Sequence, residues 1–299
     1  MDPISKKQLD RLGKRFKRYE ERPTDRGLLQ NYRDFRSEAL PTLLNEQKNL
    51  LQGMPVLQSA RAKRTDTIVR KLRRETTMQL SSVSDIIGFR IIVPSLTDQL
   101  CVLDKLESSL EYIAGIDNYI EQSRTTGYRA AHIRAKVPMS FGPDSTPTNF
   151  LYEIQIRTVY QHIWSTMSES FGENVKVTGG TGEVREFLSK LSQAIQEYEV
   201  ADRNRSQDKT IQYSEGIQFV LGIFEFDRNP IKYRFGTDIL AAVREMRVNE
   251  DRYGYGKADL VLLATSSNES DLETTHMRYF VNNGIPSIPD CLNFNKTRP

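Results

Sequence analysis

The amino-acid sequence predicts an α/β fold in which a mixed β-sheet is flanked by helices. Three observations support this prediction. The segment 86–93, IIGFRIIV, is apolar almost throughout and ends at a proline, as expected of a central strand that is buried on both faces. Segments 128–137 and 150–157 alternate apolar and polar residues with the period of a strand. Segments with helical apolar spacing surround these strands.

The order of helices and strands follows from the positions of proline and glycine and from the spacing of apolar residues along the chain. Residues 1–55 form a helical N-terminal segment, interrupted at Pro23 and Pro41. The segment 59–75 is predicted as a strongly basic helix. Further helices are expected over 96–112, over 159–171 and around 187–198, and a loop rich in Pro, Gly, Ser and Thr (138–149) joins the two alternating strands.

A polar stretch at 203–210 marks a domain boundary between a core unit over 56–205 and a tail over 211–299. The tail predicts a β-α-β accessory domain, with strands over 217–226 and 258–265 and a helix that begins after Thr237. Ser270 and Glu273 have the spacing of a capping box for a last helix. We interpret this tail as a regulatory or oligomerising unit, and we expect a homo-oligomer.

Bulk composition is that of an ordinary soluble protein, with 38% hydrophobic and 27% charged residues in 299 positions. No apolar run reaches the roughly 18 residues that a membrane span requires, and the N-terminus has no apolar signal segment. Cys101 and Cys291 are far apart and lie in no motif, so we expect reduced, buried thiols and a cytoplasmic protein. No membrane partner and no DNA partner is expected.

Charge is unevenly distributed along the chain. The whole chain carries +3, whereas residues 1–80 carry 19 Lys and Arg against 10 Asp and Glu, a net of +9. An anionic partner such as nucleotide phosphates or RNA would explain this basic front, and so would a solvated helical surface. The chain has three histidines and no zinc pattern, phosphate-binding GxxxxGK[ST] loop or GxSxG motif, which argues against a His-rich metal hydrolase and a serine hydrolase.

The two alternating strands carry a polar face each. Glu153, Gln155 and Arg157 share one face of the second strand, opposite its apolar residues. The polar face of the first strand consists of Tyr128, His132, Arg134 and Lys136. If the strands pair as a hairpin, these faces coincide and form a platform with a phenol, an imidazole and a carboxylate.

Charged residues near the central strand complete a predicted site. Arg90 lies inside the apolar run, where a buried charge needs an anionic partner. Asp85 precedes this run, and together with Glu153 it supplies the two carboxylates needed to hold Mg²⁺ between protein and phosphate oxygens. Polar side chains of the basic helix share one face, and such a face suits a polyphosphate. Binding to an RNA backbone is the rival interpretation. These groups are Lys63, Thr67, Arg70, Lys71 and Arg74.

These motifs, in this order, resemble the synthetase domain of RelA/SpoT-type proteins. The resemblance spans about residues 58–170, and its most specific part is EIQIRT (153–158) after GYxxxH (127–132). The absence of a His-rich hydrolase region makes the chain similar to the small alarmone synthetase branch. The resemblance implies a nucleotidyltransferase-like fold and Mg²⁺-dependent transfer of pyrophosphate from ATP to the 3′-hydroxyl of GDP or GTP.

The resemblance also implies roles for the matched residues. Asp85 would bind Mg²⁺, and Glu153 would be the general base and share the metal. The residues implied on the ATP side are Arg61, Lys63, Thr67, Lys71, Arg74 and Arg90. The residues implied on the acceptor side are Arg124, Tyr128, His132, Gln155, Arg157 and His162, with Tyr128 stacking on the guanine base.

Two departures from the family pattern fall on the acceptor side. Ala130 stands where the family has Ser, and the sequence after Trp164 lacks a His that the family usually carries. Two alternatives therefore stay open: a toxin-like enzyme that pyrophosphorylates the 3′-terminal adenosine of tRNA or makes adenosine alarmones, and a catalytically inactive nucleotide-binding module. The presence of both Asp85 and Glu153 argues against the inactive module.

Overall fold

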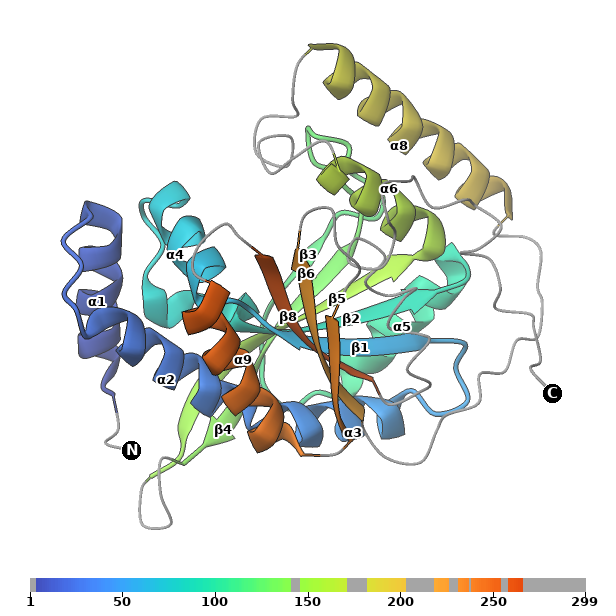
Figure 1. Cartoon of the computed structure of the whole chain (residues 1–299). Helices are drawn as coiled ribbons and strands as arrows, with labels where there is room; N and C mark the ends of the chain where they lie inside the picture. Colours follow the sequence, from blue (N-terminus) through green and yellow to red (C-terminus); the bar gives the residue numbers. More distant parts are fainter. Residues whose placement is uncertain are drawn as a thin grey trace.

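The computed structural model describes residues 4–140, 146–170, 182–202, 218–225, 231–236, 238–253 and 258–265. Figure 1 shows one large twisted sheet with helices on both of its sides. The three N-terminal helices are α1 (Lys6–Arg18), α2 (Asp25–Ser37) and α3 (Leu40–Leu50). Ser5 begins α1 with a capping box in which its side chain and that of Gln8 bond to each other's backbone amides.

The sheet has eight strands in the order β3-β4-β5-β2-β1-β8-β6-β7. The strands of the first half are β1 (Leu57–Ala62), β2 (Ile87–Val93), β3 (Ile113–Asn118), β4 (Ala131–Met139) and β5 (Thr148–Thr158). β2 runs parallel to β5, and the other pairs are antiparallel, so the sheet is mixed as predicted. β4 and β5 form the predicted hairpin, in a register that places His132 opposite Gln155.

The C-terminal strands continue the same sheet. They are β6 (Gln218–Glu225), β7 (Ile231–Gly236) and β8 (Ala258–Thr265), and the helix α9 (Ile239–Tyr253) lies between β7 and β8. β8 pairs with β1, so the expected accessory unit is joined edge to edge with the predicted core unit. Asp238 caps α9 by accepting a 2.9 Å hydrogen bond from the Ala241 amide. Thr237, the predicted cap, and the segment 266–299 with its predicted last helix lie outside the described residues.

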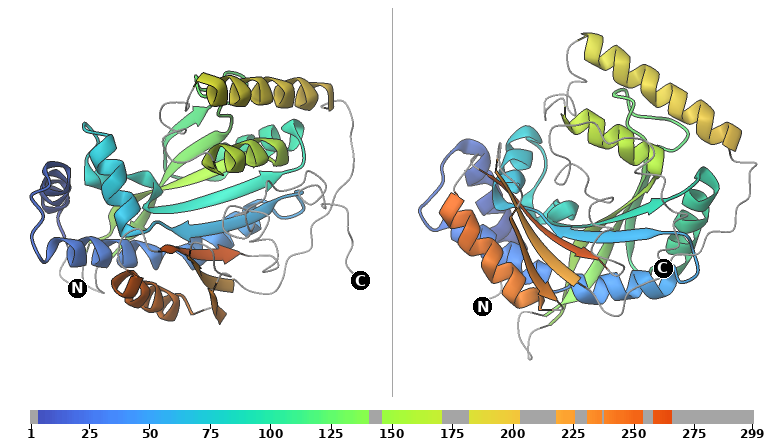
Figure 2. Two further views of the ribbon diagram at one scale, coloured as in Figure 1. Left: turned by 45° about the horizontal axis from the view of Figure 1, so that its top comes forward. Right: turned by 45° about the vertical axis from the view of Figure 1, so that its right-hand side comes forward.

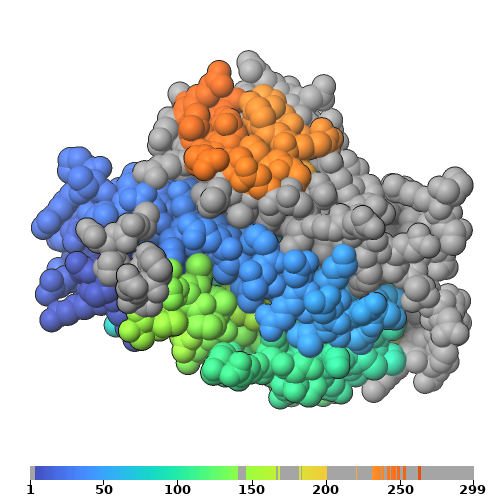
Figure 3. Space-filling model, turned by 90° about the horizontal axis from the view of Figure 1, so that it is seen from below, coloured from blue at the N-terminus to red at the C-terminus, as the bar shows by residue number. Residues whose placement is uncertain are grey.

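One face of the sheet carries the main hydrophobic core. Helix α5 (Leu96–Ser109), helix α3 and helix α9 pack against it, and the buried side chains of β4 and β5 point into it. These are Ala131, Ile133, Ala135, Tyr152, Ile154 and Ile156, each at most 2% exposed, which confirms the predicted apolar faces. Figure 3 shows this side, with α9 in orange beside the blue N-terminal helices.

The helices α4 (Thr65–Arg74), α6 (Val159–Ser170) and α8 (Gly182–Asp202) lie on the side of the opposite face. Helix α4 packs with α1 and α2 in a second core, and α6 packs with α8 through Trp164 and Leu188. Figure 2 shows α6 and α8 on the side of the sheet away from α9. The polar faces of β4 and β5 lie on this second side, between α4 and α6.

Several predicted boundaries are corrected by the structure. The segment 59–75 is not one helix, because β1 occupies Leu57–Ala62 and α4 begins at Thr65. Strand β4 begins at Ala131, so Tyr128 lies in the segment before it. The strands β3 and β7 were not predicted. Cys101 is exposed, and the expectation that it is buried is wrong. In the described part of the chain, no helix has the length and apolarity that a membrane span would need.

Candidate functional site

Two lysines enclose the carboxylate of Asp85. Lys63, between β1 and α4, donates a hydrogen bond to Oδ2 over 2.5 Å, and Lys71 of α4 donates one to Oδ1 over 2.9 Å. Asp85 lies in the short 3-10 helix η2 (Ser84–Ile86) immediately before β2. The backbone amide of Lys63 also bonds to the carbonyl of Ile86 over 2.8 Å. The start of α4 and the entry of β2 are therefore tied together at this carboxylate.

Burial and the two ammonium groups act in opposite directions on Asp85. Burial alone would raise the pKa of this carboxyl, but Lys63 and Lys71 hold the pKa well below its usual range. Burial lowers the pKa of Lys63, against the attraction of Asp85. Asp85 is therefore an ionised carboxylate at physiological pH.

Glu153, at the centre of β5, is held by neighbours on two elements. Ser84 donates a 3.2 Å hydrogen bond to its Oε2, and the amide of Gln155 donates a 2.8 Å bond to its Oε1. In the sheet, Glu153 lies beside Gly88 of β2 in the parallel register. Because Ser84 and Asp85 are adjacent in the chain, the contact of Ser84 connects Glu153 to the turn that carries Asp85.

A chain of polar contacts leads from Arg157 to Glu153. Arg157 donates a 2.8 Å hydrogen bond to the hydroxyl oxygen of Tyr128, whose oxygen lies 2.6 Å from Nε2 of His132. In the tautomer in which the phenol donates its proton to Nε2 while its oxygen accepts from Arg157, the ring proton of the neutral imidazole lies on Nδ1. Nδ1 lies 3.6 Å from Oε1 of Glu153. The chain thus aims an N–H group at the candidate base.

The imidazole of His132 is neutral at physiological pH. Burial lowers its pKa, Glu153 opposes this shift, and Arg157 and Arg124 act in the same direction as burial, so that the pKa is about 4. Burial also raises the pKa of the Tyr128 hydroxyl, although Arg157 acts against this shift. Both groups therefore keep the protonation states that the polar chain requires.

Aromatic rings pack around the ring of Tyr128. Its ring makes edge-on contacts with Tyr119, His132 and Trp164, with centroid distances of 6.4, 5.6 and 6.1 Å. The guanidinium of Arg124 lies 4.3 Å from the ring centre of Tyr119 and 5.9 Å from that of Tyr128. Planar aromatic and guanidinium groups of this kind suit the flat face of a nucleobase.

A glycine turn sets the position of Tyr128. Gly127 has a φ of +88°, and a Cβ there would lie 3.1 Å from both Trp164 and Ser192. Ser192 of α8 donates a 2.6 Å hydrogen bond to the Gly127 carbonyl, and Trp164 donates a 2.8 Å bond to the carbonyl of Leu188. Helix α8 therefore braces the turn that carries the aromatic cluster.

The remaining predicted residues are less closely joined to these two clusters. Arg61 lies on β1 opposite Gly88 and acts electrostatically on Lys63. Arg90 pairs in the sheet beside Gln155 and acts on the hydroxyl of Tyr128. Thr67 accepts a 3.4 Å hydrogen bond from Arg70, and Arg74 pairs with the adjacent Glu75 over 3.3 Å at the exposed end of α4.

His162 is 2% exposed on α6, so it is buried rather than placed on an open platform. Three further residues belong to the site and were not predicted from the sequence. They are Ser84, Tyr119 and Trp164. Ser84 could have been inferred, because it precedes Asp85 and carries a hydroxyl. Nothing in the sequence around Tyr119 and Trp164 indicated that these residues would lie near Tyr128.

The site supplies some of the oxygen ligands that a divalent cation such as Mg²⁺ requires. No group of three or more His, Cys, Asp or Glu side chains that could hold a metal occurs within the described ranges. Mg²⁺ is commonly bound by one or two carboxylates together with substrate phosphates and water. Among the described residues, Asp85 and Glu153, which are connected through Ser84, are carboxylates that could meet this requirement.

The segment that contains these residues is similar to known proteins. Residues 60–171 match the family described as the region found in RelA / SpoT proteins. The chain is 28% identical over 144 residues to the GTP pyrophosphokinase YwaC of Bacillus subtilis, covering 44% of this chain and 68% of that protein. It is 29% identical over 140 residues to the GTP pyrophosphokinase YjbM of the same organism, covering 46% and 64%.

A similar solved structure is that of small alarmone synthetase 1 from Bacillus subtilis bound to its product pppGpp, with a TM-score of 0.48 and 24% identity over 57% of this chain and 91% of that one. The match to the family lies in the segment that builds the site, from β1 to α6. Residues 60–171 therefore match the region found in RelA / SpoT proteins, and this part of the chain is similar to GTP pyrophosphokinases of Bacillus subtilis.

Proposed function

We propose that this domain transfers the β,γ-pyrophosphoryl group of ATP to the 3′-hydroxyl of GDP or GTP. The observation that supports it most directly is that Ser84 connects the two carboxylates. Ser84 donates a hydrogen bond to Glu153, and the adjacent Asp85 accepts hydrogen bonds from Lys63 and Lys71. In this reaction the hydroxyl oxygen attacks the β-phosphorus, the bond between that phosphorus and the bridging α,β-oxygen breaks, and AMP leaves.

Glu153 is the proposed general base. It would accept the proton of the 3′-hydroxyl as the new O–P bond forms. Its two oxygens accept hydrogen bonds from Ser84 and Gln155, which fix its orientation and leave lone pairs for a further donor. His132 presents Nδ1–H toward the same carboxylate and would orient the incoming acceptor.

Asp85, Lys63 and Lys71 would form the ATP side of the site. The lysines neutralise charge on phosphate oxygens, and Arg61, Thr67, Arg74 and Arg90 are proposed to assist them. Mg²⁺ would be held by Asp85 and Glu153 and, when bound, would neutralise charge between the phosphates.

Tyr128 is the proposed stacking surface for guanine, together with Arg124, Gln155, Arg157 and His162 on the acceptor side. The contacts of Tyr128 with Arg157 and Trp164 hold its ring in place before the acceptor binds. The names of the two Bacillus relatives favour a guanine nucleotide as acceptor.

The test uses ATP labelled at the γ-phosphate and supplies GDP, GTP, adenine nucleotides or deacylated tRNA in separate reactions with Mg²⁺. We expect label in the guanine nucleotides, and Glu153→Gln should reduce its transfer by about 10²-fold or more. Label that appears only in tRNA or in adenine nucleotides would show that the acceptor is not a guanine nucleotide. Equal activity of wild type and Glu153→Gln would contradict the mechanism.

The expected cytoplasmic location, homo-oligomeric assembly and division into domains at 56–205 and 211–299 stay predictions. Size-exclusion chromatography with light scattering measures the oligomeric state directly.

A further inference from the structure

Arg129 is a buried arginine beside the candidate site, and the proposed transfer reaction does not use it. It follows Tyr128 directly in the chain and is 8% exposed. A guanidinium stays charged in a protein, and its burial is costly unless acceptors of the protein satisfy its N–H groups. The partners of Arg129 therefore show which parts of the chain it holds together.

The guanidinium of Arg129 bonds to two different segments. Nη1 donates hydrogen bonds to the carbonyls of Ile120, over 2.6 Å, and of Glu121, over 3.1 Å. Nε and Nη2 donate to helix α8, namely to Oγ of Ser192 over 3.3 Å and to Oε1 of Gln196 over 2.5 Å. The planar group thus connects the segment after β3 to α8, and its fixed fork of donors suits two acceptor sets in different directions.

The same two residues of α8 make further hydrogen bonds to the chain before and after the aromatic cluster. Ser192 donates a 2.6 Å hydrogen bond to the carbonyl of Gly127. Nε2 of Gln196 donates one to the carbonyl of Glu121 over 3.4 Å. Helix α8 is therefore bonded to both ends of the segment that carries Arg124, in addition to its contacts with Arg129.

The segment that Arg129 and α8 hold carries the proposed acceptor side of the site. Tyr119, Arg124 and Tyr128 all lie within residues 119–130, which we call the acceptor loop. The amide of Tyr119 donates a 2.9 Å hydrogen bond to the carbonyl of Ala130 and so closes the loop at its base. Within the loop, the amide of Arg124 bonds to the carbonyl of Tyr128 over 3.0 Å. A support at one side of this closed loop can therefore position all three side chains.

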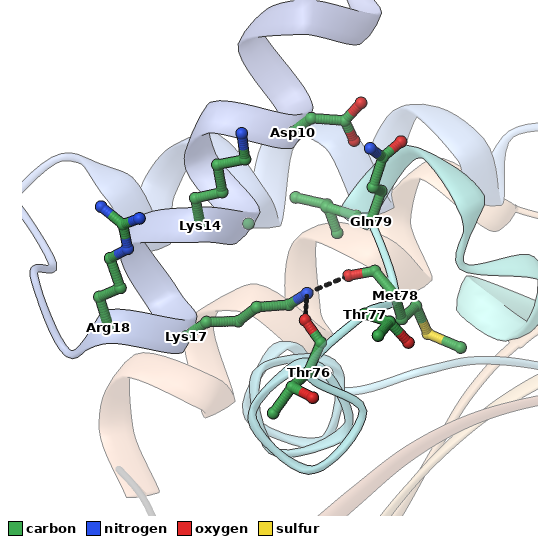
Figure 4. Close-up of a pocket in the computed structure, with 10 residues that line it drawn as sticks. Asp10, Lys14, Lys17, Arg18, Thr76, Thr77, Met78 and Gln79 are labelled. Carbon is green, nitrogen blue, oxygen red and sulfur yellow. Dashed lines mark hydrogen bonds between the residues drawn. The ribbon is translucent and has the colours of Figure 1, made fainter.

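The ATP side of the site has a separate support. Helix α1 holds the segment that follows α4, because Lys17 donates hydrogen bonds to the carbonyls of Thr76, over 2.7 Å, and of Met78. Figure 4 shows these bonds beside a pocket of about 270 Å³. Arg73 of α4 also donates a 3.0 Å hydrogen bond to the carbonyl of Phe16 in α1. These residues differ from those that hold the acceptor loop, so the two sides of the site can be disturbed separately.

We propose that Arg129, through Ser192 and Gln196 of α8, is a positioning residue that holds the acceptor loop in its binding conformation before the acceptor arrives. The proposal rests on the proposed transfer function, and α8 lies beyond residues 60–171, which match the family. A looser loop lowers the fraction of molecules that are competent to bind, and the apparent affinity for the acceptor falls with that fraction. Once the acceptor is bound, the loop is in place. The KM of the acceptor should therefore rise, while kcat and the KM of ATP keep their values.

The test compares two glutamines of α8. Gln196→Ala removes the partner of Nη2 of Arg129, whereas the matched control Gln193→Ala removes a 3.0 Å hydrogen bond to Glu197 on the exposed face of the helix. Transfer from γ-labelled ATP is measured over a range of GDP and GTP concentrations. We expect Gln196→Ala to raise the KM of the guanine nucleotide about five- to tenfold and to leave kcat and the KM of ATP within about twofold of wild type. Gln193→Ala should behave as wild type.

Arg129→Lys keeps the charge and removes the fork of donors. It should raise the same KM at least as much as Gln196→Ala, because one ammonium group cannot satisfy both segments. Hydrogen–deuterium exchange without substrate gives a second readout that does not require the transfer reaction. The amides of Arg124 and Gly127 should exchange faster in both variants than in wild type and in Gln193→Ala, while the amides of β2 should not change.

Three outcomes would overturn the proposal. Equal KM values for the guanine nucleotide in Gln196→Ala and Gln193→Ala would show that α8 does not position the loop. A rise of the KM of ATP by the same factor, or a fall in kcat alone, would show a general loss of structure. Unchanged exchange of the loop amides in Arg129→Lys would show that the guanidinium does not hold the loop. If the wild type labels no guanine nucleotide, the proposed function fails, and the exchange measurement still decides whether Arg129 holds the loop.

Discussion

The hydroxyl of Ser84 donates a 3.2 Å hydrogen bond to Oε2 of Glu153. This bond joins the turn before β2 to the centre of β5, and Asp85 follows directly in the chain. In addition to the pairing of β2 with β5, this contact connects the turn that carries Asp85 to the strand that carries Glu153, and a small change at Ser84 tests it.

Ser84→Ala removes this donor without changing the backbone. We expect the pyrophosphoryl transfer rate to fall about tenfold, because Glu153 loses one of the two bonds that orient it. Ser108→Ala on α5, whose hydroxyl bonds to the carbonyl of Lys105, is the matched control. A normal rate in Ser84→Ala would mean that β5 alone positions the base.

Asp85→Asn keeps the shape of the side chain and removes its charge. Transfer should fall by about 100-fold or more, because Lys63 and Lys71 lose their shared anion and Mg²⁺ loses a ligand. Isothermal titration with Mg²⁺ and ATP, in parallel with the rate, separates binding from chemistry. Asp104→Asn at an exposed position of α5 should behave as wild type. Equal loss in both variants would contradict the assignment.

Tyr128→Phe removes the hydroxyl that fixes the ring protons of His132. We expect a mixture of the two neutral imidazole forms, visible in the ¹⁵N chemical shifts of His132, and a several-fold rise in the KM of the acceptor. Tyr112→Phe, at a tyrosine that is 44% exposed, is the control. Unchanged ¹⁵N shifts in Tyr128→Phe would refute the polar chain.

Stability should depend on pH through His132. Its folded-state pKa of about 4 lies below the unfolded value near 6.5, so its contribution is present above pH 6.5 and is lost as pH falls toward 4. The shift corresponds to about 3 kcal/mol of unfolding free energy over this window. Urea unfolding of wild type and His132→Gln at several pH values measures it. Parallel pH curves for the two proteins would show that His132 does not contribute.

Gly127→Ala should lower the unfolding free energy by about 1–3 kcal/mol, because φ is +88° and the added Cβ presses on Trp164 and Ser192. Gly27→Ala is the contrasting substitution, since Gly27 lies in α2 with open space around its Cβ position. There we expect a gain of up to about 1 kcal/mol from helix propensity. Thermal unfolding measures both changes, and a stable Gly127→Ala would contradict the strain.

The alternation of side chains in the hairpin made the central sheet predictable. Glu153, Gln155 and His132 could be placed on one face from their positions alone, because the period of a strand is two residues. The buried strand β2 was equally clear, because a short apolar run that stops at a proline is typical of a strand covered on both faces.

The helix predicted over 59–75 was wrong at its start for a physical reason. Arg61 and Lys63 fit a basic helical face as well as they fit a strand, and only pairing with β2 and β8 decides between these conformations. The contact of Tyr128 with His132 likewise depends on the left-handed turn at Gly127 and on its brace from α8. Such long-range partners leave no periodic signal in the sequence.

The pairing of β1 with β8 affects folding of the chain during its synthesis on the ribosome. Ser59 pairs with Thr265, which is 206 positions later, while β2 on the other side of β1 is synthesised soon after it. At about 5–20 residues per second, one edge of β1 stays unpaired on the ribosome for roughly 10–40 s. An unpaired strand edge is a template for pairing with another chain. The growing polypeptide therefore exposes the free edge of β1 until β8 has emerged, and nascent chains can associate through this edge during that time.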